Sequence, residues 1–153
     1  MNAAAPLRRS AYTHLCSSLI FPLHEKLKHH DSTARLRALE QSQWWAPEAL
    51  ARQRVDRLRA FLVRVGASVP YYGALFRRVG FDPAHVKTLE DLAALPLLTK
   101  TLIRSNTDAL KSRHASGLIR YNTGGSSGEP LIFYMGNDRV SHDVAAKWRA
   151  TRW

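Results

Sequence analysis

The chain has 153 residues, of which 45% are hydrophobic and 23% charged, and its formal net charge is +11. This length and balance suit one globular domain with a core and exclude a disordered chain. The single cysteine excludes an internal disulfide and a cysteine-rich zinc site, which fits a reducing cytoplasm. No apolar run approaches the roughly 18 residues that span a bilayer, so we expect no transmembrane segment.

The positive charge is the feature that could indicate a nucleic-acid partner. Lys and Arg are spread along the chain, and even the densest run, residues 52–59, includes Asp56. We interpret this run as the solvated face of a helix and expect no nucleic acid. A diffuse positive field would still attract anionic substrates such as ATP or a CoA thioester.

The first 45 residues predict a helical arm. Residues 7–30 have helical composition and are expected to break or bend at Pro22. His29 and His30 are interpreted as solvated, because adjacent side chains on a helix point in different directions. Trp44 and Trp45 close this segment, and adjacent tryptophans are more often packing anchors than a binding cage.

Residues 46–117 predict a layer of helices. The first helix spans 46–66, with Pro47 in its first turn and Gly66 just past its end. Its apolar residues recur every three to five positions and form one stripe: Leu50, Val55, Leu58, Phe61, Leu62 and Val65. A second helix follows Val69–Pro70 and stops at Gly80. A short helix is expected from Thr88. Capping residues predict one further turn from Thr99 and another from Thr107 or Asp108.

Residues 118–153 change to a strand–loop–strand–helix pattern. Residues 118–121 and 131–135 have strand composition, and Asn137 or Asp138 can cap a last helix with Val140, Val144 and Trp148 on one face. The whole chain therefore predicts an α/β arrangement in a single, incomplete domain. Because a lone hairpin is marginal, we expect an exposed sheet edge and low independent stability.

The loop between the two strands is the chain's most informative feature. Its sequence from Tyr121 to Pro130 contains three glycines and three small hydroxyl residues. Glycines allow positive φ and close approach of a polyanion, and successive exposed N–H groups form an anion-binding nest. The loop is predicted to bind phosphate. A flexible hairpin turn without a ligand is the alternative. Tyr121 and Tyr134 could line a pocket beside it, although strand packing is the favoured interpretation.

Two common phosphate loops can be excluded. A Walker loop requires Gly-Lys-Ser/Thr, whereas Gly128 is followed by Glu129 and Pro130. The dinucleotide fingerprint requires G-x-G-x-x-G, which the loop does not contain. The loop also leads into a strand, so no helix dipole would assist binding.

The loop resembles the phosphate-binding loop of the adenylate-forming enzymes. In that pattern two hydroxyl residues and Gly are followed by two hydroxyl residues, Gly, a variable residue and Pro. The matching residues are Thr123, Gly125, Ser126, Ser127, Gly128 and Pro130. Two positions depart from it: Gly124 replaces the usual Ser or Thr, and Leu131 stands where many members carry Lys.

The ending Gly-Glu-Pro-Leu is similar to the branch that contains phenylacetate–CoA ligases and capsular polysaccharide biosynthesis proteins. The resemblance extends from about residue 40 to the end of the chain. It is carried by residues 43–45, 69–72, 89–92, 95–100 and 147–153.

The resemblance implies part of the N-terminal domain of an adenylate-forming fold. It also implies ATP-dependent activation of a carboxylic acid to an acyl-adenylate, then transfer to CoA, with ATP entering as its Mg²⁺ complex. The residues that would contact the ATP phosphates are Thr123, Gly124, Gly125, Ser126, Ser127 and Gly128.

The family's adenine, ribose and catalytic lysine motifs lie far downstream of this loop. We therefore expect an N-terminal portion of such an enzyme, inactive alone, with no catalytic residue of its own. Two other functions stay open. One is a short non-catalytic phosphate-binding module, and the other is a basic protein that binds nucleic acid or an anionic surface.

Overall fold

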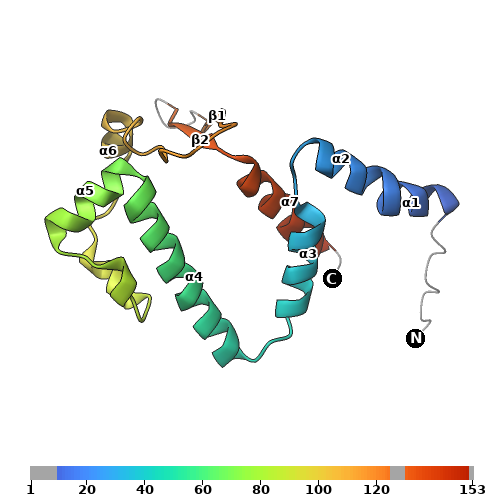
Figure 1. Ribbon diagram of the computed structural model, residues 1–153, viewed down its shortest axis with the longest axis horizontal. Helices are drawn as coiled ribbons and strands as arrows, with labels where there is room; N and C mark the ends of the chain where they lie inside the picture. Colours follow the sequence, from blue (N-terminus) through green and yellow to red (C-terminus); the bar gives the residue numbers. More distant parts are fainter. Residues whose placement is uncertain (1–9, 125–129, 152–153) are drawn as a thin grey trace. The chain divides into compact units, whose positions relative to one another are not determined.

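The computed structural model describes residues 10–124 and 130–151 (Figure 1). Its contacts divide the chain into two compact units, Met1–Gln41 with Asn137–Trp153 and Ser42–Gly136. We call them the terminal unit and the central unit. The sequence placed internal boundaries near residues 45 and 117, whereas the last helix groups with the N-terminal helices instead of the hairpin. A single, incomplete domain stays a prediction.

The terminal unit begins with a helical segment that Pro22 does not break. It consists of α1 (Ala11–Leu15), a π-helical turn η1 (Cys16–Ile20) and α2 (Phe21–Leu27). The π turn is closed by the Phe21 N–H, which donates to the Cys16 carbonyl. A proline ring crowds the carbonyl four residues before it, and the wider turn makes room for the ring. The expected break is thus replaced by a local widening.

Two further helices complete the terminal unit, α3 (Ser32–Ser42) and α7 (Asn137–Thr151). Trp148 of α7 packs on Phe21, with their ring centroids 4.8 Å apart. The buried positions of α7 are Ser141 and Ala145, one residue beyond the predicted Val140 and Val144. These small side chains let neighbouring backbone approach closely, which a pattern based on large apolar residues does not detect.

The central unit is built on α4 (Pro47–Ser68) and α5 (Pro70–Val79). Their predicted existence is confirmed, as is Gly80 as the left-handed C-cap of α5, with φ of 66°. The core consists of Leu62, Leu75, Phe76 and Val86.

Gly66 does not end α4 but lies inside it, where α5 packs closely. A Cβ on Gly66 would lie 2.9 Å from a ring carbon of Phe76, and one on Gly73 would lie 2.7 Å from the Gly66 carbonyl oxygen. Pro70 instead follows the end of α4 and starts the next helix. Gly66 therefore allows α5 to pack closely on α4 and does not end the helix.

The predicted stripe on α4 is only partly buried. Leu62 is in the core, whereas Phe61 and Leu50 are exposed. The core contacts of α4 come from Leu58 and Leu62, in its C-terminal half. The interpretation of Trp44 and Trp45 as packing anchors is wrong, because these residues are 77% and 44% exposed.

Short turns of helix follow α5: the 3₁₀ turns η2 (Pro83–His85) and η3 (Glu90–Ala94), then α6 (Lys100–Ser105). Thr99 caps α6 as predicted, because its hydroxyl accepts from the Leu102 N–H at 3.2 Å. The Asp91 carboxylate accepts from the Thr88 N–H at 2.9 Å, as a capping side chain would. The element that follows Thr88, η3, is a 3₁₀ turn and not an α-helix.

The further turn expected at Thr107 or Asp108 is present, but it does not extend into a regular helix. Residues 106–110 are turns, and the Thr107 hydroxyl donates back to the Ile103 carbonyl at 3.0 Å. The Thr107 side chain therefore hydrogen-bonds to a carbonyl of α6 and begins no new helix.

The two predicted strands are confirmed as β1 (Ile119–Asn122) and β2 (Ile132–Met135). They form an antiparallel hairpin in which Asn122 pairs with Ile132 and Ile119 with Met135. Within residues 10–124 and 130–151 these strands make up a two-stranded sheet.

Candidate functional site

The base of the glycine-rich loop is fixed by one extra pair beyond the β1–β2 ladder. The Thr123 N–H donates to the Leu131 carbonyl at 3.0 Å. In return the Leu131 N–H donates to the Thr123 hydroxyl oxygen at 2.9 Å. The side chain of Thr123 thus takes the place of a backbone carbonyl. Because a hydroxyl has a donor besides its acceptor lone pairs, Thr123 keeps its proton for another partner.

Two of the six predicted phosphate ligands lie within the described residues, Thr123 and Gly124. A Cβ on Gly124 would meet no atom within 4 Å, so the backbone there faces open space. The other four, Gly125, Ser126, Ser127 and Gly128, lie outside the described residues. The described chain therefore brings the two ends of the loop together at Thr123 and Leu131.

The two tyrosines that flank the loop have different surroundings. Tyr121 stacks on Phe133 across the hairpin, with centroids 6.0 Å apart and planes inclined by 19°, which confirms strand packing. Tyr134 instead lines a cavity of about 250 Å³ together with Ile103, Leu110, Lys111 and Leu118. This cavity is lined by residues 103–118 and by β2, not by the loop, so a pocket beside the loop stays a prediction for Tyr134.

Lys111 is the charged group at this cavity, and the sequence did not indicate it. Its ammonium nitrogen lies 4.2 Å from the Tyr134 ring centroid and 2.8 Å from Asp108 Oδ1. The hydrogen bond between them raises the pKa of Lys111 and lowers that of Asp108. The spacing of three residues between Asp108 and Lys111 is the only signal that could have suggested the pair.

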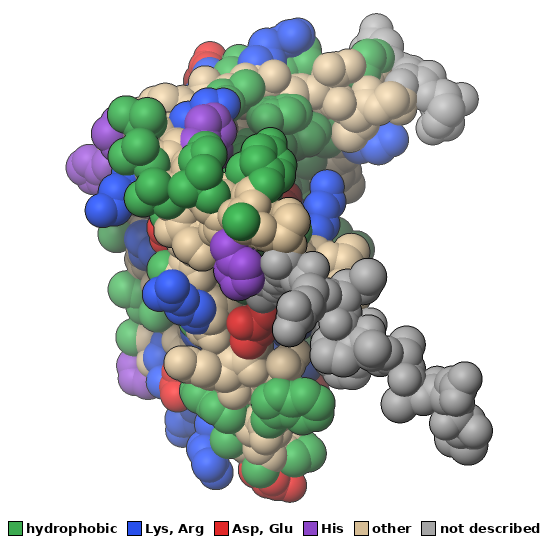
Figure 2. Space-filling view, turned by 90° about the vertical axis from the view of Figure 1, so that its right-hand side faces the viewer, with side chains coloured by type: hydrophobic (Ala, Val, Ile, Leu, Met, Phe, Trp, Pro, Cys, Tyr) green, Lys and Arg blue, Asp and Glu red, His purple; other side chains and the backbone are tan. Residues whose placement is uncertain are grey.

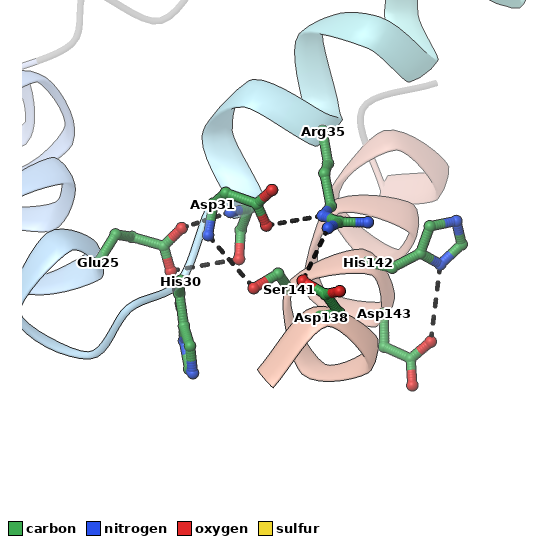
Figure 3. A network of polar contacts seen from close by, with 9 residues as sticks. Glu25, His30, Asp31, Arg35, Asp138, Ser141, His142 and Asp143 are labelled. Carbon is green, nitrogen blue, oxygen red and sulfur yellow. Dashed lines mark hydrogen bonds and ion pairs between the residues drawn. The ribbon is translucent and has the colours of Figure 1, made fainter. Parts of the chain in front are cut away.

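A second polar cluster lies in the terminal unit, around the start of α3 (Figure 3). The buried Glu25 accepts from the Ser32 N–H at 2.6 Å and from the Ser32 hydroxyl at 3.2 Å. His30 Nδ1 lies 3.8 Å from Glu25 Oε1. Of the two histidines interpreted as solvated, His29 is exposed, whereas His30 is partly buried.

The same cluster joins α3 to α7. The Asp31 N–H donates to the Ser141 hydroxyl at 3.2 Å, and Arg35 donates to Asp31 at 2.6 Å and to Asp138 at 3.2 Å (Figure 3). Arg35 lowers the pKa of Asp31 chiefly through this hydrogen bond. These groups satisfy helix ends and connect residues more than 100 positions apart. We interpret the cluster as structural.

Neither unit offers a resident metal centre among the residues described. No group of three or more His, Cys, Asp or Glu side chains lies close enough to hold an ion there. Within the same ranges no helix combines the length and apolar character needed to cross a bilayer.

The chain is similar to Protein CapK from Staphylococcus aureus, with 26% identity over 90 residues. The aligned part is 59% of this chain and 20% of that protein, so the chain matches about a fifth of its relative's length. No protein-family profile matches the chain. The likeness to CapK gives distant support for a family related to capsular polysaccharide.

Proposed function

We propose that the chain is the N-terminal portion of an adenylate-forming protein of the acid–CoA ligase type, and that its glycine-rich loop holds the phosphates of ATP. The observation that carries the proposal is the hairpin closure. Thr123 and Leu131 exchange two hydrogen bonds at the base of the loop. A closed base fixes where the loop starts and returns, which lowers the entropy lost when an anion is bound.

The chemistry of the loop fits a polyphosphate. Main-chain N–H groups and the hydroxyls of Thr123, Ser126 and Ser127 are neutral donors, and they would stabilise charge that develops on departing pyrophosphate. Leu131 provides no cation, so the loop relies on these neutral donors and on the Mg²⁺ that accompanies ATP. A carboxylate oxygen of the substrate would attack the α-phosphate and displace pyrophosphate, which gives the acyl-adenylate. The CoA thiol would then attack the acyl carbon and release AMP.

An association with capsular polysaccharide synthesis is favoured by the distant likeness to CapK. A cytoplasmic location is part of the proposal and rests on the single cysteine. The family's adenine, ribose and lysine motifs have no counterpart in these 153 residues. We therefore expect this chain to bind ATP phosphates and to leave the ATP–pyrophosphate exchange reaction at background.

The test is a comparison of three ligands by isothermal titration calorimetry. Mg²⁺-ATP and Mg²⁺-pyrophosphate should both bind saturably, whereas adenosine, which has no phosphate, should not. Binding of adenosine alone, or no binding of pyrophosphate, would contradict the proposal.

A salt titration separates the remaining functions. Affinity for double-stranded DNA that falls steeply with salt would favour a basic nucleic-acid-binding protein, because phosphate contacts release counterions. Pyrophosphate exchange above background would overturn the expectation that the chain is inactive alone, while keeping the loop as the phosphate site.

A further inference from the structure

The first helical segment of the terminal unit, residues 11–27, carries an exposed row of large hydrophobic side chains. These are between 50% and 74% exposed: Tyr12, Leu15, Leu19, Leu23 and Leu27. In Figure 2 hydrophobic side chains gather over α1 and α2, with histidine and Lys or Arg side chains beside them. Scattered exposed leucines need no explanation, but a contiguous row on one segment marks an interaction surface.

The π turn keeps this row straight. From Leu15 to Leu27 the row advances by four residues at each step. In an α-helix a residue four positions along lies about 40° further around the helix axis. A π turn contains more residues per turn, so the turn at Cys16–Ile20 offsets the drift. Without it Leu23 and Leu27 would rotate away from Leu15. The π turn therefore keeps the apolar row on one side of the segment, besides making room for Pro22.

The charges of the segment have one sign at its surface. His14, His24, Lys26 and Lys28 are exposed. The carboxylate in residues 10–28 belongs to Glu25, which points inward and is hydrogen-bonded to Ser32. The exposed surface of this described segment thus combines an apolar row with basic groups and carries no acid.

We propose that residues 11–27 form an amphipathic helix that lies in the headgroup region of an anionic lipid membrane. Leucine side chains would enter the boundary between headgroups and acyl chains. Lys26 and Lys28 would extend to the lipid phosphates, because long basic side chains place their charge at the polar level.

The observations favour a lipid surface over the other partners. A nucleic acid would use the basic groups but leave the leucines in water. A second copy of the chain would cover the leucines but bring like charges together. An anionic membrane satisfies both features at once. The surface belongs to the terminal unit, so it is independent of the phosphate loop in the central unit.

The test is co-sedimentation of the whole chain with vesicles. The wild-type chain should bind vesicles of phosphatidylcholine with about a third phosphatidylglycerol and bind pure phosphatidylcholine far more weakly. The double variant Leu19→Glu/Leu23→Glu should lose at least tenfold in affinity. Replacing Lys26 and Lys28 by Gln should weaken binding about fivefold for each lysine, since each contributes roughly 1 kcal/mol at an anionic surface.

The matched control is Leu97→Glu/Leu98→Glu, which places the same charges on two exposed leucines of the central unit. It should bind as the wild type does. Because all four leucines are exposed, the circular dichroism spectrum of each variant should be unchanged. Equal loss in both double variants, or no binding to anionic vesicles, overturns the proposal. So does a dimer in sedimentation velocity that Leu19→Glu/Leu23→Glu dissociates while vesicle binding stays the same.

Discussion

At the scale of single residues, Glu25 shows how a buried charge is used to start a helix. The first N–H groups of a helix have no partner inside it. Glu25 reaches from α2 and accepts from both the N–H and the hydroxyl of Ser32, the first residue of α3. A carboxylate from another helix thus does the work that a capping side chain usually does.

We predict that Glu25→Ala lowers the free energy of unfolding by about 1–3 kcal/mol, because it leaves a buried N–H without an acceptor. Glu25→Gln keeps one acceptor and should cost less. Urea titration followed by circular dichroism measures both. Lys26→Ala, on the exposed neighbouring residue, is the control and should change stability little. An equal loss in Glu25→Ala and Lys26→Ala would contradict this role.

Asp31 makes the stability of the terminal unit depend on pH. The hydrogen bond from Arg35 holds its pKa below the ordinary value of 3.8 in the folded chain. A lowered folded pKa contributes stability above the unfolded value, and this contribution is lost as the pH falls through the folded pKa. Because Asp31 is half-exposed, solvent limits the effect to about 1 kcal/mol.

Asp31→Asn should therefore be less stable than the wild type at pH 7, and the difference should shrink as the pH falls below 3.8. Arg35→Gln should show the same dependence, since Arg35 causes the shift. Urea unfolding at several pH values gives the difference. A difference that stays constant from pH 2 to pH 7 would rule out the ion pair as its source.

At the scale of elements, the crossing of α4 and α5 depends on two glycines. Gly73 stands where a Cβ would come within 2.7 Å of the Gly66 carbonyl oxygen. Alanine favours a helix over glycine by about 1 kcal/mol, which opposes the steric cost. The close atom is backbone and cannot turn aside, so the steric cost is larger.

Gly73→Ala is accordingly predicted to destabilise the chain by roughly 1–3 kcal/mol. Gly136→Ala is the matched control, because its Cβ would lie 4.0 Å from Leu118 and meet no closer atom. It should change stability by less than about 0.5 kcal/mol. Thermal or urea unfolding distinguishes them. A stabilised Gly73→Ala would show that helix propensity outweighs the contact.

Local chemistry made much of the element order predictable. Pro47, Pro70, Gly80 and Thr99 act at helix ends through effects of one or two residues, and their predicted positions hold. The prediction that the helix ends before Gly66 failed because close packing and helix termination both favour glycine. Trp44 and Trp45 misled because burial depends on which elements pack nearby, and that is a tertiary property.

At the scale of the whole molecule, the chain separates into two units, and the terminal unit joins two segments that are far apart in the sequence. The contacts from Asp31 to Ser141 and from Arg35 to Asp138 lie in the terminal unit, and no local pattern indicates them. In the central unit the two strands were predictable from composition. The pairing of Thr123 with Leu131 was not, because it depends on register.

The loop between Thr123 and Leu131 is proposed to bind polyphosphate. Its most direct test is titration of Mg²⁺-pyrophosphate into the wild type, into Ser126→Ala/Ser127→Ala and into the control Ser17→Ala/Ser18→Ala. We expect saturable binding to the wild type, at least tenfold weaker binding to the loop variant and unchanged binding to the control. Equal affinity in all three proteins, or no saturation in the wild type, would contradict it.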